Sequence, residues 1–152
     1  MELIKLLHLL AAVLWIGGMF FAYVVLRPSA VEVLQPPERL RLWDAVFRRF
    51  LHWVWGAIAM LLGSGVAMTH GYGGIAEAPH YVHFMLLTSM LMVAVFLQVY
   101  FRGYRKLSRR VAEQRWPEAG ETLGNIRRWV AVNLTLGIVI LCAIALGRAG
   151  YF

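Results

Sequence analysis

The feature that most constrains the fold is a set of four apolar stretches, each long enough to cross a lipid bilayer. They cover about residues 3–26, 50–69, 80–101 and 130–148. Roughly 20 apolar residues at a rise of 1.5 Å span a hydrocarbon core of about 30 Å. Apolar residues make up 61% of the chain, whereas soluble domains are roughly 45–50% apolar. We therefore predict an all-α integral membrane protein, in which residues 1–152 form a single four-span domain, an antiparallel four-helix bundle.

Prolines divide the chain between these stretches. Arg27-Pro28 follows the first stretch, and we expect the helix to end there because proline has no backbone N–H and clashes with the preceding turn. Pro36-Pro37-Glu38 predicts a helix start, with prolines and an acid in the first turn. Apolar residues at helical spacing then predict an interfacial amphipathic helix that runs into the second span. We expect Pro117–Gly120 to form a turn.

The basic residues indicate the orientation of the spans. Thirteen of the fifteen Lys and Arg residues lie in the links between spans one and two and between spans three and four. By the positive-inside rule these links face the cytoplasm. Both termini and the glycine-rich loop after span two then face the periplasm, which places the protein in a bacterial inner membrane. The net charge of +7 is therefore interpreted as a topology signal, and no nucleic-acid partner is expected.

This orientation gathers four of the five histidines in one layer near the outer face. His8 lies inside the first span, about 5–8 Å below the surface at 1.5 Å per residue, and His83 lies at a similar depth in the third. His70 and His80 lie at the surface, and His52 is on the opposite side. An ionisable side chain within a membrane is costly and needs a partner inside the protein. We therefore predict that His8 and His83 meet across the interior of the bundle.

Two cofactors suit such a layer. A b-type haem takes axial ligands from facing helices and needs small residues that leave room for the macrocycle, whereas copper takes imidazole and thioether ligands. The candidate cofactor-binding residues are His8, His83, Trp15, Gly18, Gly63 and Met85. His8 and His83 are the candidate metal ligands, with His70 and His80 as further candidates for copper. Met85, Met68 and Met90 are the candidate sulfur ligands.

These residues also have structural interpretations. His8 could hydrogen-bond to Asn133 or Thr88, and His83 to a loop carbonyl. Trp15 suits a packed core as well as a cofactor wall. The small residues of span two, Gly56, Ala59, Gly63 and Ala67, form a stripe that is typical of close helix packing.

Several stretches resemble a known family. These are the opening MELIKLLHLLAAVLWIGGMFF, the Arg27-Pro28 exit, the Pro36-Pro37 turn and the PHYVHFML entry to span three. They are similar to the short, stand-alone CopD-like copper-resistance membrane proteins over nearly the whole chain. The pattern His8…Trp15-Ile16-Gly17-Gly18 carries the sharpest part of the likeness. The resemblance implies a role in copper uptake or tolerance.

The four-span outline is also similar to the bacterial HemJ-type protoporphyrinogen oxidases. Those haem b proteins have a histidine in span one and a His-x-Lys motif near the start of span three. The first falls on His8 and the second on His83-Phe84-Met85, where this chain has methionine in place of the lysine. This resemblance implies haem b, with His8 and either His83 or Met85 as axial ligands.

Three functional hypotheses follow. The main one is a b-type haem protein of the inner membrane that moves electrons between a quinone or porphyrin-like substrate and a partner, which would make it a haem-dependent oxidoreductase. The alternative is a copper uptake or tolerance protein of the CopD type. The third is a structural membrane subunit without a cofactor. The lipid bilayer is the expected partner in each, and a homodimer would cover the edge of a haem that four short helices leave open.

Overall fold

The computed structural model describes residues 1–149, without the side chain of Arg148, and it is helical throughout apart from short links. Four helical segments in this part of the chain are long and apolar enough to cross a membrane, namely Glu2–Val33, Pro36–Tyr72, His80–Ala112 and Trp116–Gly147. The predicted all-α fold with four apolar helices of membrane length is therefore confirmed.

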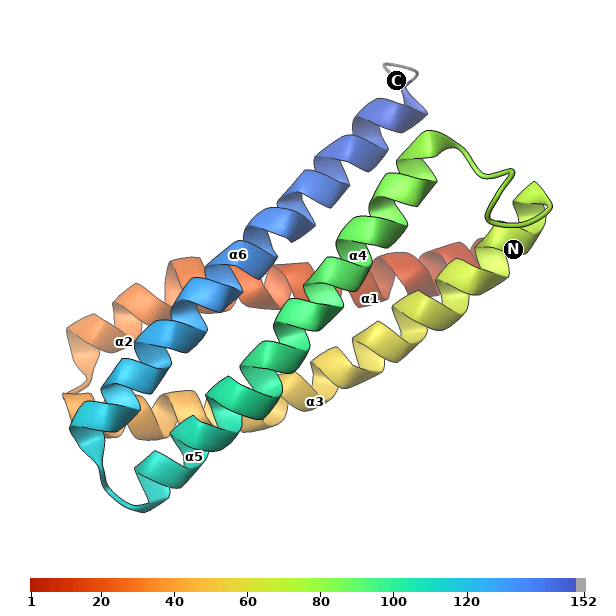
Figure 1. Ribbon diagram of the computed structural model, residues 1–152. Coiled ribbons are helices and arrows are strands. Elements are labelled where there is room, and N and C mark those ends of the chain that lie inside the picture. Colours follow the sequence, from red (N-terminus) through yellow and green to blue (C-terminus); the bar gives the residue numbers. More distant parts are fainter. Residues whose placement is uncertain (150–152) are drawn as a thin grey trace.

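Each segment is built from one or more helical elements (Figure 1). The first contains α1 (Glu2–Phe20), the π-helical turn η1 (Phe21–Leu26) and α2 (Arg27–Val33). The second contains α3 (Pro36–Thr69) and the 3₁₀ turn η2 (His70–Tyr72). The third contains α4 (His80–Gln98), the π-helical turn η3 (Val99–Tyr104) and α5 (Arg105–Ala112), and the fourth is α6 (Trp116–Arg148).

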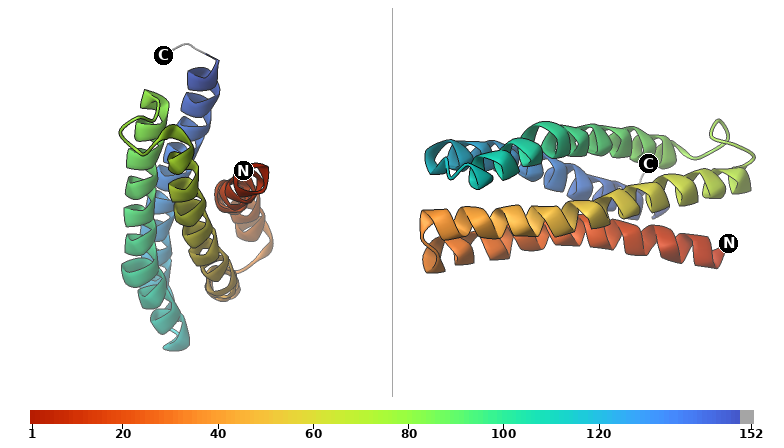
Figure 2. Two further views of the ribbon diagram at one scale, coloured as in Figure 1. Left: turned by 90° about the vertical axis from the view of Figure 1, so that its right-hand side faces the viewer. Right: turned by 90° about the horizontal axis from the view of Figure 1, so that it is seen from below.

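The segments pack as two antiparallel hairpins. Helix α1 packs mainly against α3, and α4 packs mainly against α6. Figure 1 shows the α4–α6 hairpin crossing the α1–α3 hairpin at an angle. The N-terminus, the loop 73–79 and the end of α6 lie at one end of the bundle, which we call the histidine end (Figure 2). The links 34–35 and 113–115 lie at the other, the arginine end, where the Arg41 guanidinium stacks on the Trp116 ring.

The core lies between the hairpins. The largest side chains that are fully buried are Leu107, Ile126 and Val54. Large apolar side chains also cover the outside, for example Leu9, Leu87 and Trp53, with exposures of 56%, 72% and 66%. A soluble domain rarely exposes such a surface, so the lipid bilayer is the natural surrounding of these helices.

Two expectations about proline are wrong. The first helix does not end at Pro28, because η1 precedes the proline and the backbone N–H of Arg27 donates to the carbonyl of Ala22, five residues earlier. This wider turn gives room where a proline ring would otherwise meet the preceding turn of an α-helix. The turn expected at Pro117–Gly120 is the first turn of α6 instead, a position where proline costs no hydrogen bond. The chain reverses just before it, at Gln114, which has a φ of 55°.

The expected helix start at Pro36 is confirmed. Helix α3 begins there with the prolines in its first turn, and the Glu38 side chain accepts a hydrogen bond from the backbone N–H of Gln35. The amphipathic segment and the second apolar stretch form one continuous helix. The basic residues that flank both links are thereby held at the arginine end.

Candidate histidine site

His8 is half-buried on α1 and contacts α3. Its Nδ1 atom lies 2.8 Å from the Oγ atom of Ser64. The Ser64 hydroxyl donates to the backbone carbonyl of Met60, one turn earlier in α3. Because a hydroxyl has one hydrogen, Ser64 accepts the bond from His8. We therefore predict that Nδ1 carries the imidazole proton and that Nε2 keeps its lone pair for a metal ion or a proton.

Replacing Ser64 with alanine is expected to release the His8 ring from this tautomer. The variant loses the acceptor of the Nδ1–H bond, which costs about 1 kcal/mol of stability. Nitrogen NMR of the labelled imidazoles should show Nδ1–H alone for His8 in the original chain and both tautomers in the variant. Thr135→Ala, which removes an exposed hydroxyl from α6, should leave the His8 signal unchanged. An unaltered His8 signal in the Ser64 variant would contradict the assignment.

The other histidines of this end are exposed. The Nδ1 atom of His83 donates to the carbonyl of Pro79 at 3.3 Å, and that of His70 donates to the carbonyl of Val66 at 3.0 Å. A carbonyl only accepts hydrogen bonds, so Nε2 is the free nitrogen in both rings. His80 is the first residue of α4, one turn before His83, and the two ring centroids are 6.5 Å apart.

His8 and His83 are held by different hairpins. No hydrogen bond or ring contact joins them in the part of the chain that the structure describes. His8 is paired with Ser64, and the aromatic neighbour of His83 is His80. Their meeting across the interior stays a prediction. Neither of the two structural partners expected for His8 is bonded to it. The Thr88 hydroxyl donates to the carbonyl of Phe84, and the Oδ1 atom of Asn133 is buried with no hydrogen bond.

The other candidate residues lie in varied surroundings. Trp15 is buried and makes an edge contact with Phe96, at a centroid distance of 6.2 Å. The space beside Gly18 is occupied by the ring of Phe50, so that a Cβ atom at position 18 would overlap it. Gly63 is exposed, and a Cβ atom there would meet nothing within 4 Å. Met85 packs against the core. Their roles in cofactor binding remain predictions.

Ser64 is the residue that sequence reasoning missed. The expected packing stripe of α3 included Gly56, Ala59 and Gly63, which are all exposed. The side chains of α3 that are buried beyond residue 51 are instead Val54, Ala57, Ile58 and Ser64. A hydroxyl within an apolar span, opposite a span that carries a histidine, was the available signal, since such groups hydrogen-bond across helices.

The side chains at this end that could bind a metal ion do not form a large cluster in the described part of the chain. Within residues 1–149 no group of three or more His, Cys, Asp or Glu side chains is placed to hold a metal ion. Among the described residues, His80 and His83 are the two histidines whose imidazole rings lie close together. A metal ion bound there would have open coordination positions.

The model of the family described as CopD, copper resistance protein D, matches residues 44–146. This range includes His70, His80 and His83, but His8 lies outside it. No curated protein and no solved structure matches the chain. The similarity to HemJ-type oxidases is not shown by any of these comparisons.

Proposed function

The chain belongs to the copper resistance protein D family, and from this premise we propose that it is a copper-handling membrane protein which takes up copper at its histidine end. The supporting observation is the pair His80 and His83. Two imidazoles that bind one ion from opposite sides, each at about 2 Å, have ring centroids about 6 Å apart. The separation of 6.5 Å is close to that value. Copper, the metal in the family's name, is well suited to imidazole ligands.

The surroundings of this pair favour brief binding. Both rings are exposed, and they lie in the first turn of α4, where the positive end of the helix dipole disfavours a cation. Two ligands on an exposed surface suit an ion that is accepted and passed on. A storage site would instead have a closed ligand shell.

His8 is proposed as a deeper ligand. Its Nδ1–H is fixed by Ser64, and a hydrogen bond from the second ring nitrogen is the usual support of a metal-binding imidazole. We propose the orientation in which the histidine end faces the periplasm and the arginine end faces the cytoplasm of a bacterial inner membrane. In this arrangement the four helices act as one domain that receives copper from outside.

Haem b has weaker support. A haem needs open space between its two ligands, whereas Phe50 covers Gly18, and Trp15 already packs against Phe96. An oxidoreductase role with a quinone or porphyrin-like substrate depends on that haem and shares its weakness.

The test is metal analysis of the full-length protein, purified in detergent from cells supplied with both copper and a haem precursor. We expect Cu(I) to bind reversibly, at one ion per chain, with no Soret absorbance. Silver(I), a redox-inert analogue of Cu(I), should compete for the same site. Stoichiometric haem would overturn the proposal, as would a chain that binds no copper at micromolar concentrations.

A further inference from the structure

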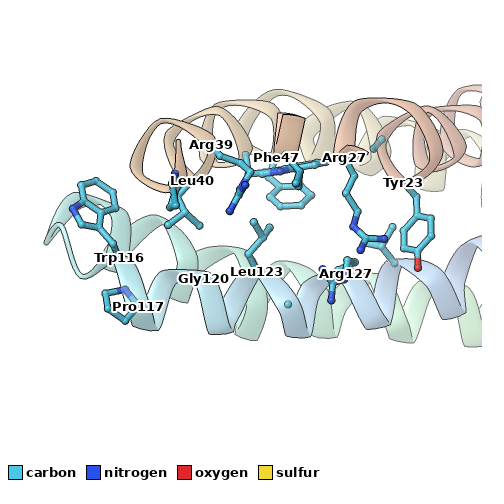
Figure 3. A pocket seen from close by; sticks show the side chains of 16 residues that line it. Tyr23, Arg27, Arg39, Leu40, Phe47, Trp116, Pro117, Gly120, Leu123 and Arg127 are labelled. Atoms are coloured by element: carbon cyan, nitrogen blue, oxygen red, sulfur yellow. The ribbon is translucent and has the colours of Figure 1, made fainter. Parts of the chain in front are cut away.

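A cavity of about 350 Å³ lies at the arginine end, between the segment α1–α2 and the start of α3 on one side and α6 on the other (Figure 3). Most of its wall is apolar. Tyr23, Leu40, Phe47, Trp116 and Leu123 are among the residues that line it. Its volume is in the range of small-molecule binding sites, about 300–1,000 Å³.

Three arginines line the same cavity. Figure 3 shows Arg27 and Arg39 extending from the side of α2 and α3 toward α6, with Arg127 on α6 below Arg27. Arg27 and Arg39 are half-buried, and Arg127 is exposed at the edge of the cavity. The Arg27 guanidinium stacks on the Tyr23 ring, 5.3 Å from its centroid, and this contact limits the directions in which it can point.

No acidic side chain balances these charges. The residues that line the cavity include no Asp or Glu. In the described part of the chain, the basic residues that form ion pairs are Lys5 and Arg115. Three guanidinium groups thus share one apolar-walled cavity without a counter-charge. Such an arrangement is stabilised by an anion, and a phosphate group, like a carboxylate, matches the forked donors of a guanidinium.

We propose that this cavity binds an anionic phospholipid of the surrounding bilayer. The phosphate lies among Arg27, Arg39 and Arg127, and an acyl chain follows the apolar wall toward Tyr23 and Val130. The apolar lining favours a lipid over a free phosphate ion, which would leave that wall uncovered. Basic pockets between transmembrane helices are known to accept anionic headgroups. The proposal is independent of copper, because the histidines lie at the other end of the bundle.

The test uses full-length protein in a neutral detergent, titrated with phosphatidylglycerol and observed by native mass spectrometry. We expect one phosphatidylglycerol molecule per chain, and affinity lower by at least about tenfold for phosphatidylcholine, whose choline carries a positive charge. Inorganic phosphate at the same concentration should not displace the lipid. Displacement by inorganic phosphate, or equal binding of both lipids, would overturn the proposal.

Two variants with the same loss of charge separate the cavity from general attraction. Replacing Arg27, Arg39 and Arg127 with glutamine should lower the affinity for phosphatidylglycerol by at least about tenfold. Replacing Arg48, Arg49 and Arg109, which are exposed and line no part of the cavity, should change it by less than about twofold. Equal losses in the two variants would contradict a specific site.

A third variant fills the cavity and keeps every arginine. Gly124 lines the cavity, and a Cβ atom there would meet nothing within 4 Å, so Gly124→Leu is expected to fold. Its side chain should exclude the acyl chain and lower the affinity for phosphatidylglycerol by at least about tenfold. Gly56→Leu is the control, because position 56 has equal space but lies outside the cavity. Wild-type binding by a folded Gly124→Leu protein would refute this placement of the lipid.

Discussion

Replacing His80 and His83 together with alanine is expected to reduce the copper affinity of the purified protein by about a hundredfold or more. The double variant removes both imidazoles of the pair whose ring centroids lie 6.5 Å apart. Loss of an outer-shell partner alone typically costs 10–100-fold in metal affinity, so loss of both ligands should cost at least as much. The measurement is a titration with Cu(I) against a competing chelator, with a circular dichroism spectrum to show that the helices remain.

His52→Ala is the matched control for this experiment. His52 is also an exposed helical histidine whose Nδ1 atom donates to a carbonyl one turn earlier, that of Arg48. It belongs to the middle of α3 and has no histidine neighbour among the ring contacts of the described residues. Its removal should leave the affinity within about twofold. A double variant that still bound copper as tightly as the original chain would place the site elsewhere, and His8→Ala would then be the variant to measure.

Replacing Trp15 with alanine is expected to give the largest loss of stability of any single change considered. Only 4% of Trp15 is exposed, and its ring packs against Phe96. Truncation of a buried aromatic side chain costs about 3–5 kcal/mol. We expect a value near the lower limit, about 3 kcal/mol, because helices in lipid associate through packing and not through the hydrophobic effect. The measurement is the midpoint of unfolding in detergent.

A second tryptophan provides the comparison. Trp53 on α3 is 66% exposed, and Trp53→Ala should change the free energy of unfolding by about 0.5 kcal/mol or less. Equal effects of the two substitutions would show that Trp15 is not part of the packed core. If Trp15 were chiefly the wall of a haem pocket, its loss would instead shift a Soret band and leave the unfolding of the apoprotein nearly unchanged.

The fold was largely predictable because its main determinant is local. A stretch of about 20 apolar residues must form a helix in a bilayer, since no water is present there to satisfy its backbone. The ends of the helices were harder to predict from the prolines alone. Pro28 lies within a helix because a π-turn precedes it, and Pro117 lies in the first turn of one because the chain has already reversed at Gln114. Both outcomes depend on the neighbouring backbone as well as on the proline.

For the candidate site, the sequence predicts the depth of each residue along its span but not the direction in which its side chain points. The position of a residue along a span gives its depth, and depth alone gathered His8, His70, His80 and His83 at one end. Rotation about the helix axis and the choice of neighbouring helix are not contained in that count. The choice of neighbour is why the hydrogen-bond partner of His8 is Ser64 and not Asn133. The small-residue stripe was misleading for a related reason, because Gly63 is exposed although Ser64 beside it is buried.

The π-turns η1 and η3 change the direction in which the side chains beyond them point. A turn with one additional residue rotates everything beyond it by about 100° relative to an uninterrupted α-helix. Side chains in α2 therefore point in directions rotated from those that an uninterrupted α1 would give them, and the same holds for α5 relative to α4. Arg27, the first residue after η1, lines the cavity beside α6. The first segment thus keeps α1 packed against α3 and still places Arg27 in the cavity beside α6, without a break in the chain's helical path.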